Sequence, residues 1–297
     1  MPKRNKRLPI PLPLVILLCL AACDDSPSAP PTMVEGGSWY TTGFRWPHDG
    51  NPYETEHFIV YSDAASTEAR QTVAEIGEEL LVVLREDFGI EGDTLFRFPL
   101  GQTKIHIFAY KDHTPTEWGG QSYHAGFLIY SLDHPDRTEW GHTEMGMYVP
   151  VVKHELMHVI EGLLIGTIDL NLVDKWLTEG IAESVSGGTA GGSITSLTKF
   201  EEVIATYGEL NPIAMHHQSQ YPNIEGVAYF YYYPMFELAV NYLLDPAGAG
   251  VVKTDFRDIY LDIRDGETFA TAFENRLGIS LADYETEFFD LMRDYLP

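Results

Sequence analysis

The stretch VVKHELMHVIEG, residues 151–162, is the part of this sequence that says most about the fold and the site. His154 and His158 are four residues apart, so on an α-helix they lie on one face, about one turn apart. Two imidazoles placed in this way can hold one metal ion, and Glu155 beside them can reach a water bound to that ion. The alternative is an ordinary buried helix whose two histidines each bond a backbone carbonyl.

The neighbours of the histidines favour the metal site. An ionisable group in an apolar helix needs a partner or a metal, because burying it alone is costly. Two satisfied core histidines would leave Glu155 unexplained. The apolar residues that surround the three ionisable ones are Val151, Val152, Leu156, Val159, Ile160 and Leu163.

A catalytic zinc site needs three protein ligands and one open position, so a third ligand must come from elsewhere in the chain. The pattern H-E-x-x-H-x-x-G-x-x-H fails here, because Glu161 and Leu164 occupy the places of its glycine and third histidine. A glutamate on a following helix is the other solution. The stretch DKWLTEGIAESVSGG, residues 174–188, supplies Glu179, with 20 residues between it and His158.

HELMH followed by WLTEGIAE resembles the gluzincin metallopeptidases, the superfamily of thermolysin and aminopeptidase N. The W-x-x-E-G-x-A-E pattern of that superfamily is matched by Trp176, Glu179, Gly180, Ala182 and Glu183. The resemblance implies one zinc ion held by His154, His158 and Glu179, with Glu155 as the general base. It also implies that Glu183 accepts the other N–H of a ligand histidine. A solvated helix face is the alternative for Glu183.

The same resemblance extends to both sides of the zinc helices. Gluzincins have a strand-rich subdomain before the zinc helix, and its edge strand pairs with extended substrate. HAGFLIYSLD, residues 124–133, is expected to be that edge strand. Downstream, YYYPMFELAVNYLL, residues 231–244, resembles the helix that supplies an oxyanion-stabilising tyrosine, which picks Tyr232. The other candidates for that role are Tyr229, Tyr231, Tyr233, His216 and His217.

Two features of the superfamily's best-known branches are missing from the sequence. The G-A-M-E-N exopeptidase signature of aminopeptidase N is absent, so trimming of amino termini is not implied. The calcium loops of secreted thermolysin-type enzymes are not recognisable either. The resemblance therefore indicates a small gluzincin outside both groups.

The first residues are those of an exported lipoprotein. A basic MPKRNKR is followed by a short apolar segment that ends in Leu20-Ala21-Ala22-Cys23 and resembles a bacterial lipobox. Cys23 is then the lipidated first residue of the mature chain, and residues 1–22 are the signal peptide. A plain signal peptide with an incidental cysteine is the alternative. The expected location is the bacterial cell envelope, facing the periplasm or the exterior.

Charge and cysteine content narrow the function further. The chain has 19 basic and 44 acidic residues, a formal net charge of −25. Four basic and no acidic residues lie in 1–22, so the mature chain keeps 15 basic residues against 44 and a net charge of −29. Such a surface repels nucleic acid, which excludes it as an expected partner. The only other cysteine, Cys19, lies in the signal, so no disulfide forms within the mature chain.

Hydrophobic periodicity predicts an α+β fold, and the resemblance to gluzincins implies that this fold is zincin-like. Strands are expected over 57–63, 103–110 and 125–133. A helix is expected over 66–89, with Ser66 as N-cap and Gly89 as its stop, and helical patterns dominate from about residue 148. Two helices are expected within 265–296. The domains expected along the chain are the signal 1–22, a tether and extension 23–50, an α+β upper subdomain 51–147, and the zinc helices with a helical lower subdomain 148–297.

The function expected from these features is zinc-dependent hydrolysis of peptide bonds in a peptide or protein substrate, by an enzyme tethered to the membrane at Cys23. Two alternatives stay open. One is a non-catalytic binding lipoprotein that keeps a metallopeptidase fold. The other is a zinc hydrolase that acts on a bond other than a peptide.

Overall fold

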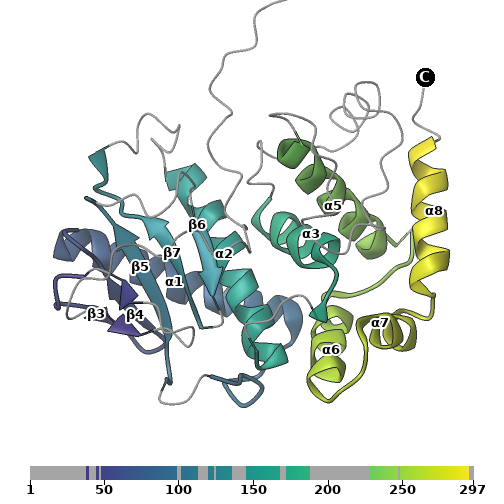
Figure 1. Ribbon diagram of the computed structural model, residues 1–297, viewed down its shortest axis with the longest axis horizontal. Helices are drawn as coiled ribbons and strands as arrows, with labels where there is room; N and C mark the ends of the chain where they lie inside the picture. The colour runs from purple at the N-terminus through teal and green to yellow at the C-terminus, as the bar shows by residue number, and fades with distance from the viewer. Residues whose placement is uncertain are drawn as a thin grey trace, which may run out of the picture.

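The fold is α+β, with a sheet at one side of the molecule and a group of helices at the other (Figure 1). The computed structural model describes residues 38–39, 45–46, 48–98, 102–112, 120–123, 125–135, 145–167, 172–187, 228–246 and 248–293. The expected signal peptide, Cys23, the segment 24–37, His216 and His217 lie outside these ranges. So do the side chains of Tyr229, Tyr231 and Tyr232, although their backbone belongs to a described helix.

The elements follow the order that the sequence pattern indicates, with one long helix between the early strands and helices only after the last strand. The strands are β1 (Ser38–Trp39), β2 (Arg45–Trp46), β3 (Tyr53–Glu54), β4 (Phe58–Tyr61), β5 (Ile105–Tyr110), β6 (Gly120–Tyr123) and β7 (Gly126–Tyr130). The helices are α1 (Thr67–Phe88), α2 (Met145–Ile165), α3 (Lys175–Ser186), α5 (Ala228–Leu244), α6 (Lys253–Arg264), α7 (Phe269–Leu277) and α8 (Leu281–Arg293).

The strands form a mixed sheet in the order β3-β4-β5-β7-β6, beside a separate ribbon of β1 and β2. The three central strands, β4, β5 and β7, run parallel, and β3 and β6 are antiparallel to their neighbours. Helix α1 connects β4 to β5, as a parallel pair requires. The hairpin of β6 and β7 then completes the sheet.

The prediction that residues 124–133 form the edge strand is wrong. They contain β7, which pairs with β5 on one side and β6 on the other. Every residue of β7 is buried, as expected of an interior strand covered on both faces. Among the described strands, the edge on this side is β6. Its sequence, GQSY, has little of the β-branched and apolar content that marks a strand, which is why the sequence pattern does not reveal it.

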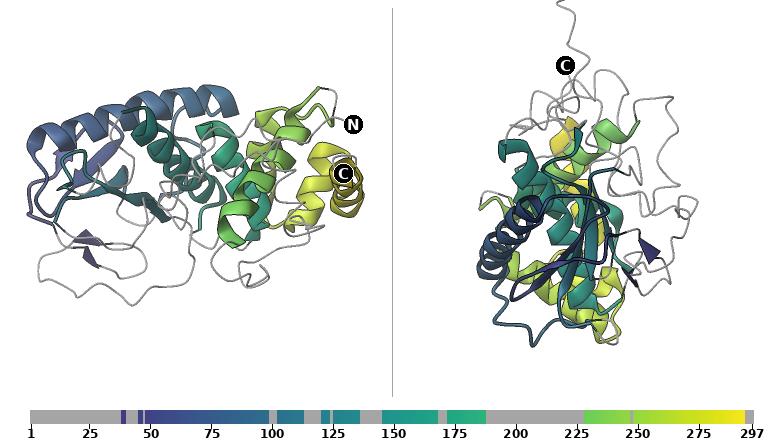
Figure 2. Two further views of the ribbon diagram at one scale, coloured as in Figure 1. Left: turned by 90° about the horizontal axis from the view of Figure 1, so that it is seen from above. Right: turned by 90° about the vertical axis from the view of Figure 1, so that its left-hand side faces the viewer.

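One face of the sheet packs against helices α1 and α2. Alternate residues of the parallel strands, such as Val60, Ile107 and Phe127, join the main hydrophobic core with these helices. Figure 2 shows α1 lying along this face. The predicted caps of α1 are confirmed: the Ser66 hydroxyl accepts a hydrogen bond from the Ala69 amide, and Gly89 ends the helix in the left-handed conformation. These caps satisfy backbone groups that the helix itself leaves open.

Helix α2 lies between the sheet and the remaining helices, in contact with β6, β7, α3 and α6 (Figure 1). It is apolar on nearly all sides, so it is buried on nearly all sides. The main core runs without a break from the sheet through α2 to α8. The position of α2 places its few polar side chains in the middle of the molecule.

Among the described residues, no helix combines the length and apolarity that a membrane-spanning segment requires.

Candidate metal centre

Helix α2 supplies His154, Glu155 and His158, and all three side chains are buried. The four-residue spacing puts both imidazoles on one face of the helix, and their ring centroids are 4.8 Å apart. The predicted histidine pair therefore forms as the spacing indicates.

Helix α3 brings Glu179 to the histidines. Trp176 anchors the helix, since its indole is fully buried and stacked on Tyr284 of α8. Gly180 lets α3 approach α5 closely, because a Cβ at this position would lie 2.4 Å from the Phe236 carbonyl oxygen. Tryptophan and glycine of the W-x-x-E-G pattern thus fix where the helix lies, and this position carries the glutamate between them to the site.

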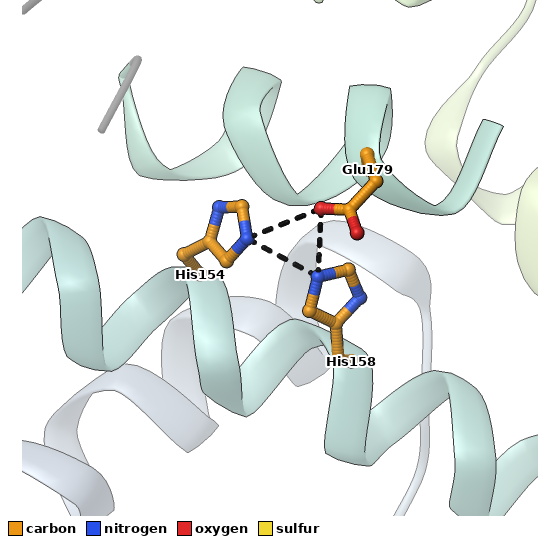
Figure 3. A group of neighbouring side chains, drawn as sticks. All are labelled: His154, His158 and Glu179. Carbon is orange, nitrogen blue, oxygen red and sulfur yellow. Dashed lines mark hydrogen bonds and ion pairs between the residues drawn. The ribbon is translucent and has the colours of Figure 1, made fainter. Parts of the chain in front are cut away.

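Three ligand atoms meet at one point between α2 and α3 (Figure 3). Nε2 of His158 lies 3.1 Å from Nε2 of His154 and 3.2 Å from Oε2 of Glu179. Nε2 of His154 lies 3.4 Å from the same carboxylate oxygen. The cluster is buried and could hold a metal ion.

Each imidazole has a carboxylate on its other nitrogen. Oε1 of Glu183 lies 3.2 Å from Nδ1 of His154, and Oε2 of Glu161 lies 2.9 Å from Nδ1 of His158. A carboxylate can only accept, so each Nδ1 carries the proton and each Nε2 is left with a lone pair. Two nitrogen lone pairs and a carboxylate oxygen then face one another, an arrangement that a cation stabilises.

Lys175 balances part of the negative charge of the site. Its ammonium lies 3.2 Å from Oε1 of Glu179, the carboxylate oxygen that does not face the histidines. Burial alone would raise the pKa of Glu179, but the charge of Lys175 and the contacts with the two histidines outweigh it and hold that pKa well below its usual range. Glu179 therefore stays ionised and able to bind a cation.

Glu155 is different from the other acidic residues of the site. It is fully buried, and neither carboxylate oxygen has a hydrogen-bond partner among the residues that the structure describes. Burial raises the pKa of Glu155 to about 7, against the opposing effect of the two histidines. Because a buried polar group without a partner is costly, Glu155 has the character of a group that acts on a molecule entering the site.

The structure brings together five of the residues singled out from the sequence, namely His154, Glu155, His158, Glu179 and Glu183. It does not describe the side chain of Tyr232. Three other residues of the site were not predicted. Glu161 and Lys175 could have been found from the sequence, because each lies three or four residues from a predicted ligand and so shares a helix face with it. Tyr260, whose hydroxyl donates to Glu161, could not, since 99 positions separate the two residues.

Comparison with known proteins adds no family to this description. No family model matches the chain, and no curated protein is significantly similar to it.

Proposed function

We propose that this protein is a zinc-dependent metallopeptidase of the gluzincin type. The observation that carries the proposal is the convergence of His154, His158 and Glu179 next to the unpartnered carboxylate of Glu155. Tetrahedral nitrogen and oxygen ligands about 2.0–2.1 Å from a zinc ion are about 3.3–3.4 Å apart. The three separations here, 3.1, 3.2 and 3.4 Å, are close to that value.

The residues of the site suit hydrolysis with an activated water. A zinc ion bound there would supply a Lewis acid that polarises the peptide carbonyl and lowers the pKa of water. Glu155 takes a proton from the attacking water on a carboxylate oxygen and passes it to the leaving amine. Glu161 and Glu183 keep the ligand nitrogens in the required tautomer. Tyr232, or His216 or His217 in its place, is proposed as the donor to the oxyanion.

The sheet supports binding of an extended substrate. Strand β6, rather than β7, is the edge strand proposed to pair with a peptide backbone, and it packs against α2. A mixed sheet with an antiparallel edge next to the metal helix is also what a zincin-like fold would have. We propose further that Cys23 is lipidated and tethers the enzyme to a membrane of the cell envelope, so that its substrates are peptides or proteins outside the cytoplasm.

The test uses the full chain in detergent, with Glu155→Gln as the variant. Parent and variant should each bind about one zinc per chain, because Glu155 is not a ligand. Hydrolysis of a peptide library should fall by about 10²- to 10⁴-fold in the variant, the usual contribution of a general acid–base residue. Glu78→Gln, which removes a carboxylate paired with His57 away from the site, is the control and should keep full activity.

The other outcomes select between the alternatives. A parent that binds zinc but cleaves only esters or non-peptide amides would be a zinc hydrolase of another substrate class. A parent that binds no zinc after reconstitution would contradict the proposal and favour a non-catalytic binding protein. Unchanged peptide hydrolysis in Glu155→Gln would show that Glu155 is not the general base.

A further inference from the structure

Glu161 and Tyr260 form a chain of contacts that ends at a metal ligand. Glu161 lies on α2, three residues after His158, and its Oε2 is 2.9 Å from Nδ1 of that histidine. Its other oxygen, Oε1, accepts a hydrogen bond of 2.6 Å from the hydroxyl of Tyr260 on α6. Both side chains are fully buried.

These contacts are buried in the core, where polar groups are costly unless they are paired. A carboxylate and a phenol hydroxyl in the core each need a partner, and here each satisfies the other while the imidazole satisfies the second oxygen. A hydrophobic pair of the same size would fill the space without that requirement. Two other described tyrosines, Tyr148 and Tyr284, also donate from a buried hydroxyl, but each donates to a backbone carbonyl, that of Tyr130 or of Ala239, and not to a partner of a metal ligand.

We infer that Glu161 and Tyr260 are positioning residues for the ligand His158, an inference that rests on the proposed metal site. Glu161 holds the proton of His158 on Nδ1 and sets the rotation of the ring, so that the Nε2 lone pair faces His154 and Glu179. Tyr260 fixes the carboxylate of Glu161 from the opposite helix. Metal affinity thus depends on α6, although α6 carries no ligand.

Helix α6 is itself firmly held, which makes it a suitable support. Arg257 donates to the carbonyl oxygens of Phe88 and Gly89 at the end of α1, and Lys253 pairs with Asp87. Through Tyr260 and Glu161, the orientation of His158 therefore depends on how α1 and α6 are packed. His154 is supported differently, by Glu183 from the neighbouring helix α3.

The test is the zinc affinity of the full chain, measured by competition with a chelator. Removing a group that orients a metal ligand typically weakens affinity by about 10- to 100-fold. We expect that loss for Glu161→Ala. Glu161→Gln should lose less, because its amide oxygen can still accept from Nδ1, and Tyr260→Phe should also weaken binding. Tyr284→Phe is the matched control, since it removes a buried tyrosine hydrogen bond to the Ala239 carbonyl but keeps the ring that stacks on Trp176, so zinc affinity should be unchanged.

A second readout separates positioning from a general loss of stability. Cobalt(II) bound in place of zinc absorbs visible light in a way that depends on ligand geometry, so its spectrum should change in Tyr260→Phe and stay as in the parent in Tyr284→Phe. Folded Glu161→Gln and Tyr260→Phe variants that bind zinc like the parent, with an unchanged cobalt spectrum, would overturn the inference. If Glu161→Ala does not fold, Glu161→Gln and Tyr260→Phe are enough to test the positioning role. A parent that binds no metal would instead overturn the proposed function, and the inference with it.

Discussion

The interior of this protein holds several ionisable side chains, and the residues around each of them explain how it is tolerated. His154, His158 and Glu179 face one another and each has an outer partner of suitable charge or hydrogen-bonding capacity. Such buried groups are stable only as a complete set, because removing one partner leaves an uncompensated polar group. Glu155 is the member without a partner among the described residues, and this is why we propose it as the general base.

His106 on β5 is a buried histidine outside the site, and it predicts an acid-sensitive stability. Burial lowers its pKa from 6.5 to about 4, with Glu54 opposing the shift. The unfolded chain therefore binds a proton below about pH 6.5 that the folded chain rejects until about pH 4. Stability is lost as pH falls through this window, by about 2 kcal/mol between pH 7.5 and pH 5.

Urea unfolding of the parent and of His106→Gln at both pH values checks this expectation. The variant should lose about 2 kcal/mol less on acidification than the parent. Other titrating groups are common to both proteins, so their contributions cancel in the comparison. An equal loss of stability in the two proteins would show that His106 does not carry the effect.

At the scale of single residues, the sequence predicts whatever depends on local spacing. The histidine pair, Glu155 and the glutamate of W-x-x-E-G all follow from positions one helical turn apart or from a contiguous pattern. Glu161 was open to the same reasoning, since it lies three residues from His158 on an apolar helix. Tyr260 was not, because the contact that gives it a role is tertiary and depends on how α6 packs against α2.

Between elements, the contact of α3 with α5 decides where Glu179 lies, and Gly180 is the residue that permits it. Alanine in place of a helical glycine ordinarily stabilises a protein by about 0.5–1 kcal/mol. Here its Cβ would lie 2.4 Å from the Phe236 carbonyl oxygen and 2.7 Å from Cγ2 of Val240. The two helices must move apart, so we expect Gly180→Ala to destabilise the fold by about 1–3 kcal/mol.

Gly77 provides the matched control for this prediction. It also lies inside a helix, α1, but a Cβ there would lie 3.1 Å from the ring of Phe58, a milder overlap than the 2.4 Å at Gly180. Chemical denaturation should therefore show a clearly smaller loss for Gly77→Ala than for Gly180→Ala. A stabilised Gly180→Ala would mean that α3 and α5 are not in the close contact described.

Most of the longer elements were predicted from the sequence, whereas the short strands and the bounds of α6 were not. Helix α1, strands β4, β5 and β7, and helices α3, α5, α7 and α8 match the expected segments to within a few residues. Strand β6 did not show in the sequence because GQSY has almost no apolar content. The error about the edge strand follows from that omission, since β7 would be an edge if β6 did not pair with it.

On the scale of the whole molecule, the sheet and the helices share one core, and α2 runs through its centre. Polar contacts also join the first helix to a late one, since Arg257 and Lys253 of α6 bind the end of α1. Residues on either side of position 147, where the sequence suggested a subdomain boundary, are therefore packed together. We expect the chain to unfold as a single cooperative unit.

Zinc should then stabilise regions that lie far from the ligands. An ion that binds only the folded chain adds about 2.7 kcal/mol when its free concentration is 100 times its Kd, which slows exchange through global unfolding about 100-fold. We expect this slowing for amides of β5 and of α7 as well as of α3, measured by hydrogen exchange with zinc and with a chelator. His158→Ala, which lacks a ligand, should show no such difference. Slowing confined to α2 and α3 would mean instead that the sheet and the last helices unfold independently of the metal centre.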